Sequence, residues 1–218
     1  MRIQHFTIGP LETNAYLVVD EGSRQALIID PGLESEGIYG VIRDEGLELS
    51  AIVNTHGHFD HVCGNAFYKA KTGAPVLLHR EDVAMMRRAA EQALTFGFQV
   101  PTPPPPDRLL TEGDEVVIGG SRLRVLHTPG HTLGGICLTR EGIVFVGDTL
   151  YAGSIGRTDL PGGSYDVLIA SIRSQLLSLP DETTVYPGHG PPTTIGEERV
   201  HNPFLTGRGG TPLLHFDA

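Results

Sequence analysis

The 218 residues of this chain suffice for one large domain that buries most of its apolar surface. With 39% hydrophobic and 19% charged residues, and no apolar run near the roughly 18 residues that cross a membrane, the chain is typical of a globular protein that does not span a membrane. Because 16 basic residues face 26 acidic ones, the net charge of −10 repels phosphate backbones and disfavours a nucleic-acid partner.

The N-terminal segment and the cysteines indicate the cellular compartment of the protein. Residues 1–20 alternate in character and include acids, unlike a secretory signal, so we expect a cytoplasmic protein whose chain begins at or near Met1. Cys63 and Cys137 stand apart without a C-x-x-C motif, which favours buried thiols over a disulfide. No pattern in the sequence indicates an oligomeric state.

Strand and helix patterns alternate along the first half of the chain, as in an α/β protein. The expected strands lie at 15–19, 25–30, 49–55 and 75–79, and the expected helices at 35–45, 61–72 and 81–94. In the last of these helices Val83, Met86, Ala90 and Leu94 share one face.

The proline-rich segment 100–107 interrupts this alternation, since four consecutive prolines continue neither helix nor sheet. Strand and helix patterns then resume. Strand patterns lie within 114–118, 122–128, 134–139, 142–148 and 183–190, and a long helix is expected at 164–179. Neither the segment before the prolines nor the segment after them looks able to form a domain alone, so we expect one domain over 1–218 built from two similar halves. The prolines would form a stiff crossover or a rim of the site.

Histidine and aspartate side chains, which can bind metals, directly follow four of the expected strands. They are His56, His58, Asp60 and His61 after the first of these strands, and His131, Asp148 and His189 after the later three. Ligands gather at such strand ends in α/β sheets, because loops converge there while the strands stay rigid. An isolated histidine at a strand end usually caps the chain or forms a hydrogen bond at the surface. Seven histidine and aspartate residues at four strand ends instead favour a shared metal site.

The spacing divides these residues between two divalent ions. His56 and His58, two apart in an extended segment, point toward one ion together with His131, whereas Asp60, His61 and His189 fit a second ion and Asp148 bridges the two. Two ions that share a hydroxide can drive hydrolysis of a carbonyl or phosphoryl group, with Asp60 and Asp148 as its catalytic carboxylates. Zinc is expected first, although the same ligands can hold iron or manganese.

The motifs T-H-x-H-x-D-H at 55–61, G-H-T at 130–132, G-D-T-L at 147–150 and G-H-G at 188–190 resemble those of the metallo-β-lactamase superfamily. The resemblance implies a four-layer αβ/βα sandwich, two mixed sheets packed face to face with helices outside and the metals at one edge. True β-lactamases usually carry cysteine where this chain has Asp148, so the resemblance disfavours antibiotic hydrolysis.

The segments 127–138, 145–163 and 188–205 are similar to short, single-domain glyoxalase II-type hydrolases. The resemblance implies a thioester substrate, S-(2-hydroxyacyl)glutathione, split into glutathione and a 2-hydroxy acid. The helical domain that holds glutathione in longer relatives has no counterpart here. Arg157 corresponds to their lysine, Asp159 and Pro191 replace their two tyrosines, and Arg199 and Arg208 are candidate replacement cations for substrate binding.

An oxidoreductase is the alternative. Persulfide dioxygenases of the same superfamily bind one iron through the equivalents of His56, His131 and Asp148, and they share the segment G-R-T-D at 156–159. The wider sequence context favours hydrolysis. Asp30, which ends an expected strand, is either a turn cap or a carboxylate that orients a ligand histidine from the second shell.

Overall fold

The computed structural model describes residues 1–207, which form two six-stranded sheets and a short hairpin. The first sheet has the strand order β1 (Arg2–Ile8), β2 (Thr13–Asp20), β3 (Gln25–Ile29), β4 (Glu48–Val53), β5 (Val76–His79), β6 (Arg108–Leu110). The second has the order β14 (Thr193–Thr194), β13 (Thr184–Pro187), β10 (Ile143–Gly147), β9 (Ile136–Arg140), β8 (Ser121–His127), β7 (Glu115–Ile118). The hairpin pairs β11 (Leu150–Tyr151) with β12 (Ser154–Ile155).

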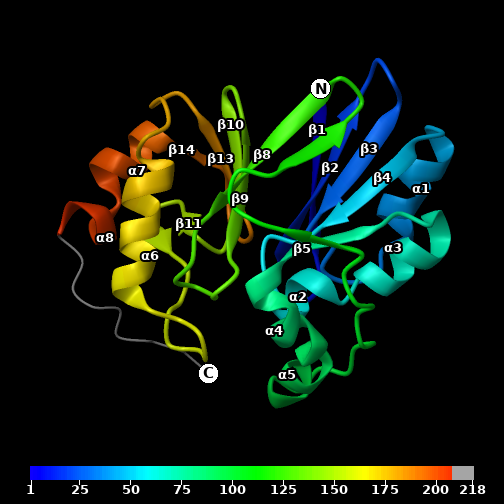
Figure 1. Cartoon of the computed structure of the whole chain (residues 1–218), viewed down its shortest axis with the longest axis horizontal. Coiled ribbons are helices and arrows are strands. Elements are labelled where there is room, and N and C mark those ends of the chain that lie inside the picture. The colour runs from blue at the N-terminus through cyan, green and yellow to red at the C-terminus, as the bar shows by residue number, and fades with distance from the viewer. Residues whose placement is uncertain (208–218) are drawn as a thin grey trace.

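Helices cover the outer face of each sheet. Those before β6 are α1 (Glu36–Asp44), α2 (Phe59–Val62), α3 (Asn65–Thr72), the 3-10 turn η1 (Arg80–Asp82), α4 (Val83–Arg87) and α5 (Ala89–Thr95). Those after β12 are α6 (Tyr165–Ser171), the π-helical turn η2 (Ile172–Leu176), α7 (Ile195–His201) and α8 (Pro203–Thr206). Figure 1 shows the resulting order of helices, sheet, sheet and helices from one side of the molecule to the other.

Three apolar clusters separate these four layers. In β2 and β3 the residues Leu17 and Ile28 face the helices, whereas Val18 and Leu27 face the second sheet, because successive side chains of a strand point to opposite faces. A third cluster packs the second sheet against α6 and α7. Both sheets are mixed, since β3 to β6 pair in parallel and β10 pairs in parallel with β13 while the other neighbours are antiparallel. The αβ/βα sandwich is therefore confirmed.

Three predicted helices differ from the structure. The segment 61–72 is divided between α2 and α3 at Cys63 and Gly64. The segment 81–94 is divided among η1, α4 and α5, with a break between α4 and α5 at Arg88. Its buried apolar positions are Met86, Ala89 and Ala93 rather than the face ending in Leu94, which is 59% exposed. The helix predicted over 164–179 ends as η2. The edge strand β1 was not predicted.

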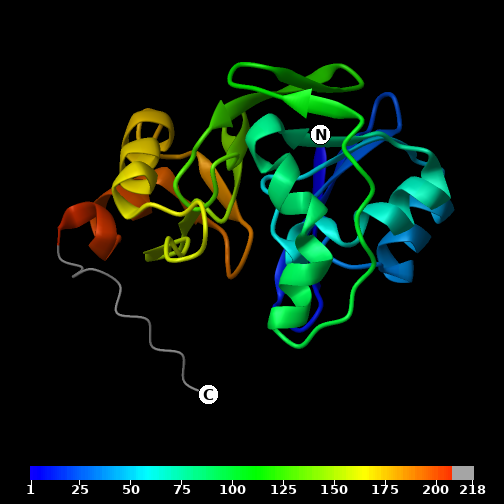
Figure 2. The ribbon, with the colours of Figure 1, turned by 60° about the horizontal axis from the view of Figure 1, so that its bottom comes forward.

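The link between α5 and β6 contains the proline run. Figure 2 shows this connection running along the first half of the molecule before it reaches β6. Among the described residues no helix has the length and apolar character that crossing a membrane requires. The single domain predicted over 1–218 extends beyond the described residues and stays a prediction.

Candidate metal centre

The strands β4, β8, β10 and β13 end at one edge of the molecule, and the segments after them carry the seven metal-type side chains. His56 and His58 follow β4, Asp60 and His61 lie in α2, and His131, Asp148 and His189 follow β8, β10 and β13 respectively. The structure brings all seven into one cluster.

Asp148 lies in the middle of this cluster. Its Oδ2 is 3.5 Å from His131 Nε2 and 4.0 Å from His56 Nε2. The same oxygen is 3.7 Å from His189 Nε2, and Oδ1 is 3.4 Å from His61 Nε2. One carboxylate therefore faces histidines from both halves of the chain.

The remaining donors form two groups on either side of Asp148. His56, His58 and His131 make one group and Asp60, His61 and His189 the other, with the candidate ligand atoms of each group within 4.8 Å of one another. Within the second group, Asp60 Oδ2 is 3.4 Å from His61 Nε2 and 3.3 Å from His189 Nε2. Imidazole and carboxylate donors at this density are the set that zinc and related ions prefer.

Four buried atoms of the cluster have no hydrogen-bond partner: His56 Nε2, His58 Nε2, His61 Nε2 and Asp148 Oδ1. A buried polar atom without a partner costs about 1 to 3 kcal/mol, so native proteins rarely leave several together. A cation bound beside Asp148 would satisfy His56 Nε2, His61 Nε2 and Asp148 Oδ1. The residues present therefore fit a divalent metal.

Outer hydrogen bonds fix which ring nitrogen faces the cluster. His131 Nδ1 donates to the carbonyl of Arg157 at 2.7 Å, and His189 Nδ1 donates to that of Leu11 at 3.0 Å. Each bond leaves Nε2 as a lone pair directed inward, the form in which imidazole binds a metal.

Asp30 serves the same purpose for His61 and, through Thr55, for His56. Asp30 Oδ2 accepts from His61 Nδ1 at 3.0 Å and from Thr55 Oγ1 at 2.6 Å, while Thr55 Oγ1 lies 3.1 Å from His56 Nδ1. The backbone of Asp30 has φ of 48°, a left-handed conformation that is uncommon outside glycine and often marks functional sites. Of the two interpretations left open for Asp30, the contacts support the orienting carboxylate.

Burial keeps two of the histidines neutral. Burial, followed by the charges of His61 and His131, holds the pKa of His56 well below its usual value. Burial, followed by His131, lowers the pKa of His58 to about 3. Neutral imidazole is the form that a metal requires, so these side chains lose no proton when an ion binds.

The carboxylates are ionised despite their burial. Burial acts to raise the pKa of Asp60 and of Asp148, but His61, the largest opposing influence on each, brings both pKa values below the usual range. Conversely, burial acts to lower the pKa of His61, and Asp60, Asp148 and Asp30 outweigh it, so that pKa lies well above the usual value. The carboxylates around His61 therefore favour a positive charge at this position.

The cluster is more open on one side. Side-chain exposure is 27% for His189 and 16% for Asp60, whereas it is 9% for Asp148 and 2% for His56. A substrate would therefore approach along the Asp60 and His189 side. The Tyr151 ring stands edge-on to His189 at 6.2 Å, and burial followed by the Asp148 charge raises the Tyr151 pKa well above its usual value, which keeps this phenol protonated.

Asp82 is a buried carboxylate that sequence reasoning missed. It accepts hydrogen bonds from Gly57 N at 2.8 Å, Thr132 Oγ1 at 2.8 Å and Gly134 N at 2.6 Å. These bonds join the loop of His56 and His58 to the loop of His131. Burial raises the pKa of Asp82, and the three hydrogen bonds offset part of that rise. An acidic residue at a helix start is usually a cap, so no sequence pattern indicated this role.

Asn14 supports the loop of His189. Its Nδ2 donates to the carbonyls of Pro187 at 3.0 Å and Gly190 at 2.8 Å, and its backbone N–H donates to Gly188 at 2.7 Å. A Cβ on Gly188 would lie 2.2 Å from Asp148 Oδ1, so only glycine permits this close approach.

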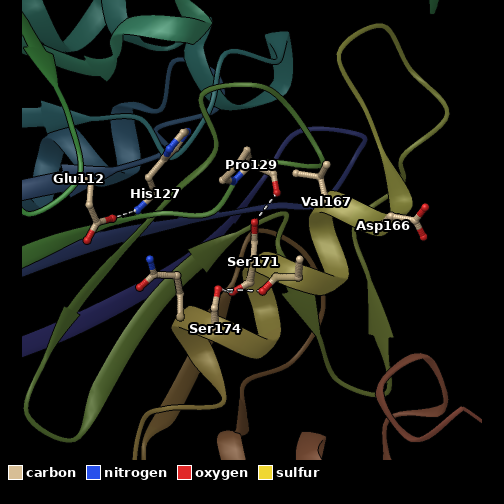
Figure 3. Close-up of a pocket in the computed structure, with 9 residues that line it drawn as sticks. Glu112, His127, Pro129, Asp166, Val167, Ser171 and Ser174 are labelled. Atoms are coloured by element: carbon tan, nitrogen blue, oxygen red, sulfur yellow. Dashed lines mark hydrogen bonds between the residues drawn. The ribbon is translucent and has the colours of Figure 1, made fainter.

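The His131 loop is braced from outside by α6. Ser171 Oγ donates to the carbonyl of Pro129 at 2.7 Å, a bond drawn in Figure 3. A hollow of about 500 Å³ lies beside this bond, lined by residues that include Glu112, His127 and Asp166. None of the seven cluster residues lines it, so we do not regard it as the reaction site.

The predicted substrate-binding arginines have different surroundings. The Arg157 guanidinium pairs with Asp159, at 2.8 Å from Nε and 2.7 Å from Nη2, close to the backbone that holds His131. Arg199 in α7 bonds to Asp181 and to the carbonyls of Leu177 and Leu179, and none of these partners belongs to the cluster. Arg208 lies outside the described residues.

The family model described as the Metallo-beta-lactamase superfamily matches residues 8–189. The chain therefore belongs to the metallo-β-lactamase superfamily, as its motifs predicted. The curated relative hydroxyacylglutathione hydrolase GloC of Haemophilus influenzae is 38% identical over an alignment of 212 positions that covers 95% of this chain and 100% of that protein.

Two solved structures are similar throughout. The BLEG-1 B3 metallo-beta-lactamase has a TM-score of 0.88 at 39% identity, covering 94% of this chain and 100% of that one. TTHA1623 in a di-iron-bound form has a TM-score of 0.85 at 43% identity, covering 93% of this chain and 100% of that one. Together these matches confirm both the predicted family and the predicted fold.

Proposed function

We propose that this protein is a dinuclear metal-dependent hydrolase that cleaves a thioester, S-(2-hydroxyacyl)glutathione, to glutathione and a 2-hydroxy acid. The observation that carries the proposal is the position of Asp148 between two groups of three donors, with buried atoms of His56, His61 and Asp148 left without partners. The similarity to a hydroxyacylglutathione hydrolase over the whole chain supports the substrate class.

Each ion would have three ligands of its own and one shared ligand. His56, His58 and His131 would hold the first ion, Asp60, His61 and His189 the second, and Asp148 both. When bound by these residues, divalent ions, zinc first and iron or manganese as alternatives, would supply a water activated near neutral pH and positive charge for a developing oxyanion. The di-iron form of TTHA1623 supports two ions at such a centre.

The protein's own residues supply orientation and charge. Asp30 and Thr55 hold His61 and His56 with Nε2 toward the centre, and the carbonyls of Arg157 and Leu11 do so for His131 and His189. The thiol product leaves readily as a thiolate, so the reaction does not require a strong general acid. The Arg157 backbone holds His131, and we assign the Arg157 guanidinium, which pairs with Asp159, to contact with the polar thiol portion of a substrate.

A one-iron persulfide dioxygenase is the second candidate. His56, His131 and Asp148 lie close enough together for a two-histidine, one-carboxylate site, with Asp148 Oδ2 at 4.0 and 3.5 Å from the two rings. That assignment leaves Asp60, His61 and His189 without a role, although they form an equally tight donor group. The second group therefore favours the hydrolase.

Three parallel assays on the metal-loaded protein test the proposal. One follows thiol release from S-lactoylglutathione, one follows oxygen uptake with glutathione persulfide, and one follows opening of a chromogenic β-lactam, since one structural neighbour is a β-lactamase by description. We expect thiol release, and we expect Asp148→Ala to lower its kcat/KM more than 100-fold, beyond the usual effect of a residue that only orients a ligand. Oxygen uptake or β-lactam opening without thiol release would overturn the proposal.

A further inference from the structure

A small apolar recess adjoins Asp60, on the open side of the centre. Its walls come from four separate segments: the turn at 8–11 with Leu11, the loop of Leu33, the start of α2 with Phe59, and the segment after α5 with Phe98 and Val100. The Phe59 and Phe98 rings, which both line the recess, lie 5.9 Å apart. Thr13 and Asp60 are the polar side chains of the lining, and Thr13 Oγ1 is 3.3 Å from Asp60 Oδ2.

The size and polarity of the recess suit one small alkyl group. Its volume of about 30 Å³ leaves room for one small group such as a methyl, and Thr13 and Asp60 are the only polar side chains among the residues that line it. A water molecule needs two to four polar partners to be stable in a cavity, and here Thr13 already donates to Asp60. A methyl group would fill the recess without leaving a polar group unsatisfied.

The opposite flank of the centre is charged. There His131 is held by the backbone of Arg157, whose guanidinium pairs with Asp159. A glutathione thioester has one charged end and one apolar end. Its thiol portion is polar and charged, whereas its acyl portion ends in an alkyl group. Matching polarity directs the thiol toward Arg157 and the alkyl group toward Phe59.

We propose that the recess beside Asp60 binds the alkyl group on the acyl chain, so that the centre prefers thioesters of 2-hydroxy acids bearing a methyl group over those bearing none. This inference rests on the proposed thioesterase function. It identifies Leu33, Phe98 and Val100 as residues that determine specificity for the acyl group. It also predicts an upper size limit, because a longer or aromatic substituent exceeds the recess.

The first test compares acyl groups on the same thiol. The kcat/KM values of S-glycolyl-, S-lactoyl- and S-(2-hydroxybutanoyl)glutathione are measured and divided by the rates of their uncatalysed hydrolysis. We expect S-lactoylglutathione to exceed S-glycolylglutathione about 10-fold, the lower end of what one methylene contributes in an apolar pocket. The 2-hydroxybutanoyl ester should gain nothing further. A normalised lactoyl-to-glycolyl ratio near one would overturn the inference while leaving the proposed function intact.

Matched variants locate the effect. Val100→Phe should fill the recess and bring the lactoyl-to-glycolyl ratio to about 2 or less. Val117→Phe places the same side chain on β7, where Val117 is 49% exposed, and should keep the wild-type ratio. Phe98→Ala should enlarge the recess and shift preference toward 2-hydroxybutanoyl, which decides the question if Val100→Phe does not fold. Equal ratios in the two phenylalanine variants would overturn the inference, and failure to hydrolyse any of the esters would overturn the proposed function itself.

Discussion

The histidines of the centre depend on neighbours at their outer nitrogens. Asp30 and Thr55 orient His61 and His56, whereas His131 and His189 rely on backbone carbonyls. The acceptors at Arg157 and Leu11 are far from the motifs in sequence. The geometry of the centre is therefore a property of the folded chain rather than of the motif alone.

Asp82 provides the clearest test of such support at the scale of one residue. Asp82→Ala would leave the N–H groups of Gly57 and Gly134 and the Thr132 hydroxyl unpaired in the interior, which should cost about 3 kcal/mol or more of unfolding free energy. Metal affinity should fall about 10- to 100-fold, as is typical when residues that support ligands are lost. Urea unfolding and competition with a chelator measure the two effects.

Two further variants separate orientation from general destabilisation. Asp82→Asn keeps one acceptor oxygen and should restore part of both losses, whereas Glu81→Ala alters the exposed neighbour and should change stability by less than about 0.5 kcal/mol. Metal affinity in Asp82→Ala equal to that of wild type would show that Asp82 does not position the ligand loops.

His79 should make stability depend on pH. Burial, followed by the stacked ring of His127 at 4.2 Å, lowers the pKa of His79 to about 4. The unfolded chain binds a proton near pH 6.5, so this contribution to stability is present above pH 6.5 and is lost as pH falls toward 4. Urea unfolding of the metal-free protein should therefore show a smaller loss between pH 6.5 and 4 in His79→Phe than in wild type. Parallel pH profiles for the two proteins would contradict this assignment.

At the scale of elements, the β1–β2 hairpin forms one wall of the site. Thr13 makes a β-bridge with His189, and the preceding turn supplies both the carbonyl of Leu11 and a side of the apolar recess. The strand β1 was not predicted, because its edge position leaves a weak burial pattern, with Thr7 exposed beside half-buried Ile8. The Leu11 carbonyl and this side of the apolar recess were therefore not predicted either.

Asn14 ties this hairpin to the His189 loop. Asn14→Ala would leave the buried carbonyl of Pro187 and the carbonyl of Gly190 without the amide donor, so we expect a loss of about 1 to 3 kcal/mol in unfolding free energy. Metal binding at the ion held by His189 should weaken as well. Thr7→Ala, on the paired strand opposite Asn14, is the matched control. Equal stability of both variants in urea would mean that Asn14 does not anchor the loop.

The segment 81–94 shows where periodicity misleads. A continuous helix would place Val83, Met86, Ala90 and Leu94 on one face, but the break at Arg88 rotates α5 relative to α4 and buries Ala89 and Ala93 instead. No proline or glycine marks the break. Tertiary packing decides it, and a single sequence does not carry that information.

At the scale of the whole molecule, the sequence predicted the features that depend on local residue patterns, namely most of the strands and the residues of the centre. Alternating apolar runs located the sheets, and metal-type residues after strands such as β4 and β10 located the centre, because strand ends converge by topology. The contacts of Asp82, Asn14 and the recess could not be predicted, since each joins segments separated by tens of residues without a motif. The partners of Arg199 were likewise beyond prediction, and its proposed contact with substrate stays a prediction.

Metal content is the most direct test of the dinuclear centre. Wild-type protein, Asp60→Ala and His58→Ala are loaded with zinc, freed of excess ion, and analysed for metal per chain. We predict about two ions in wild type and about one in each variant, because the substitutions remove ligands from different donor groups. One ion in wild type, still present in Asp60→Ala, would contradict the account.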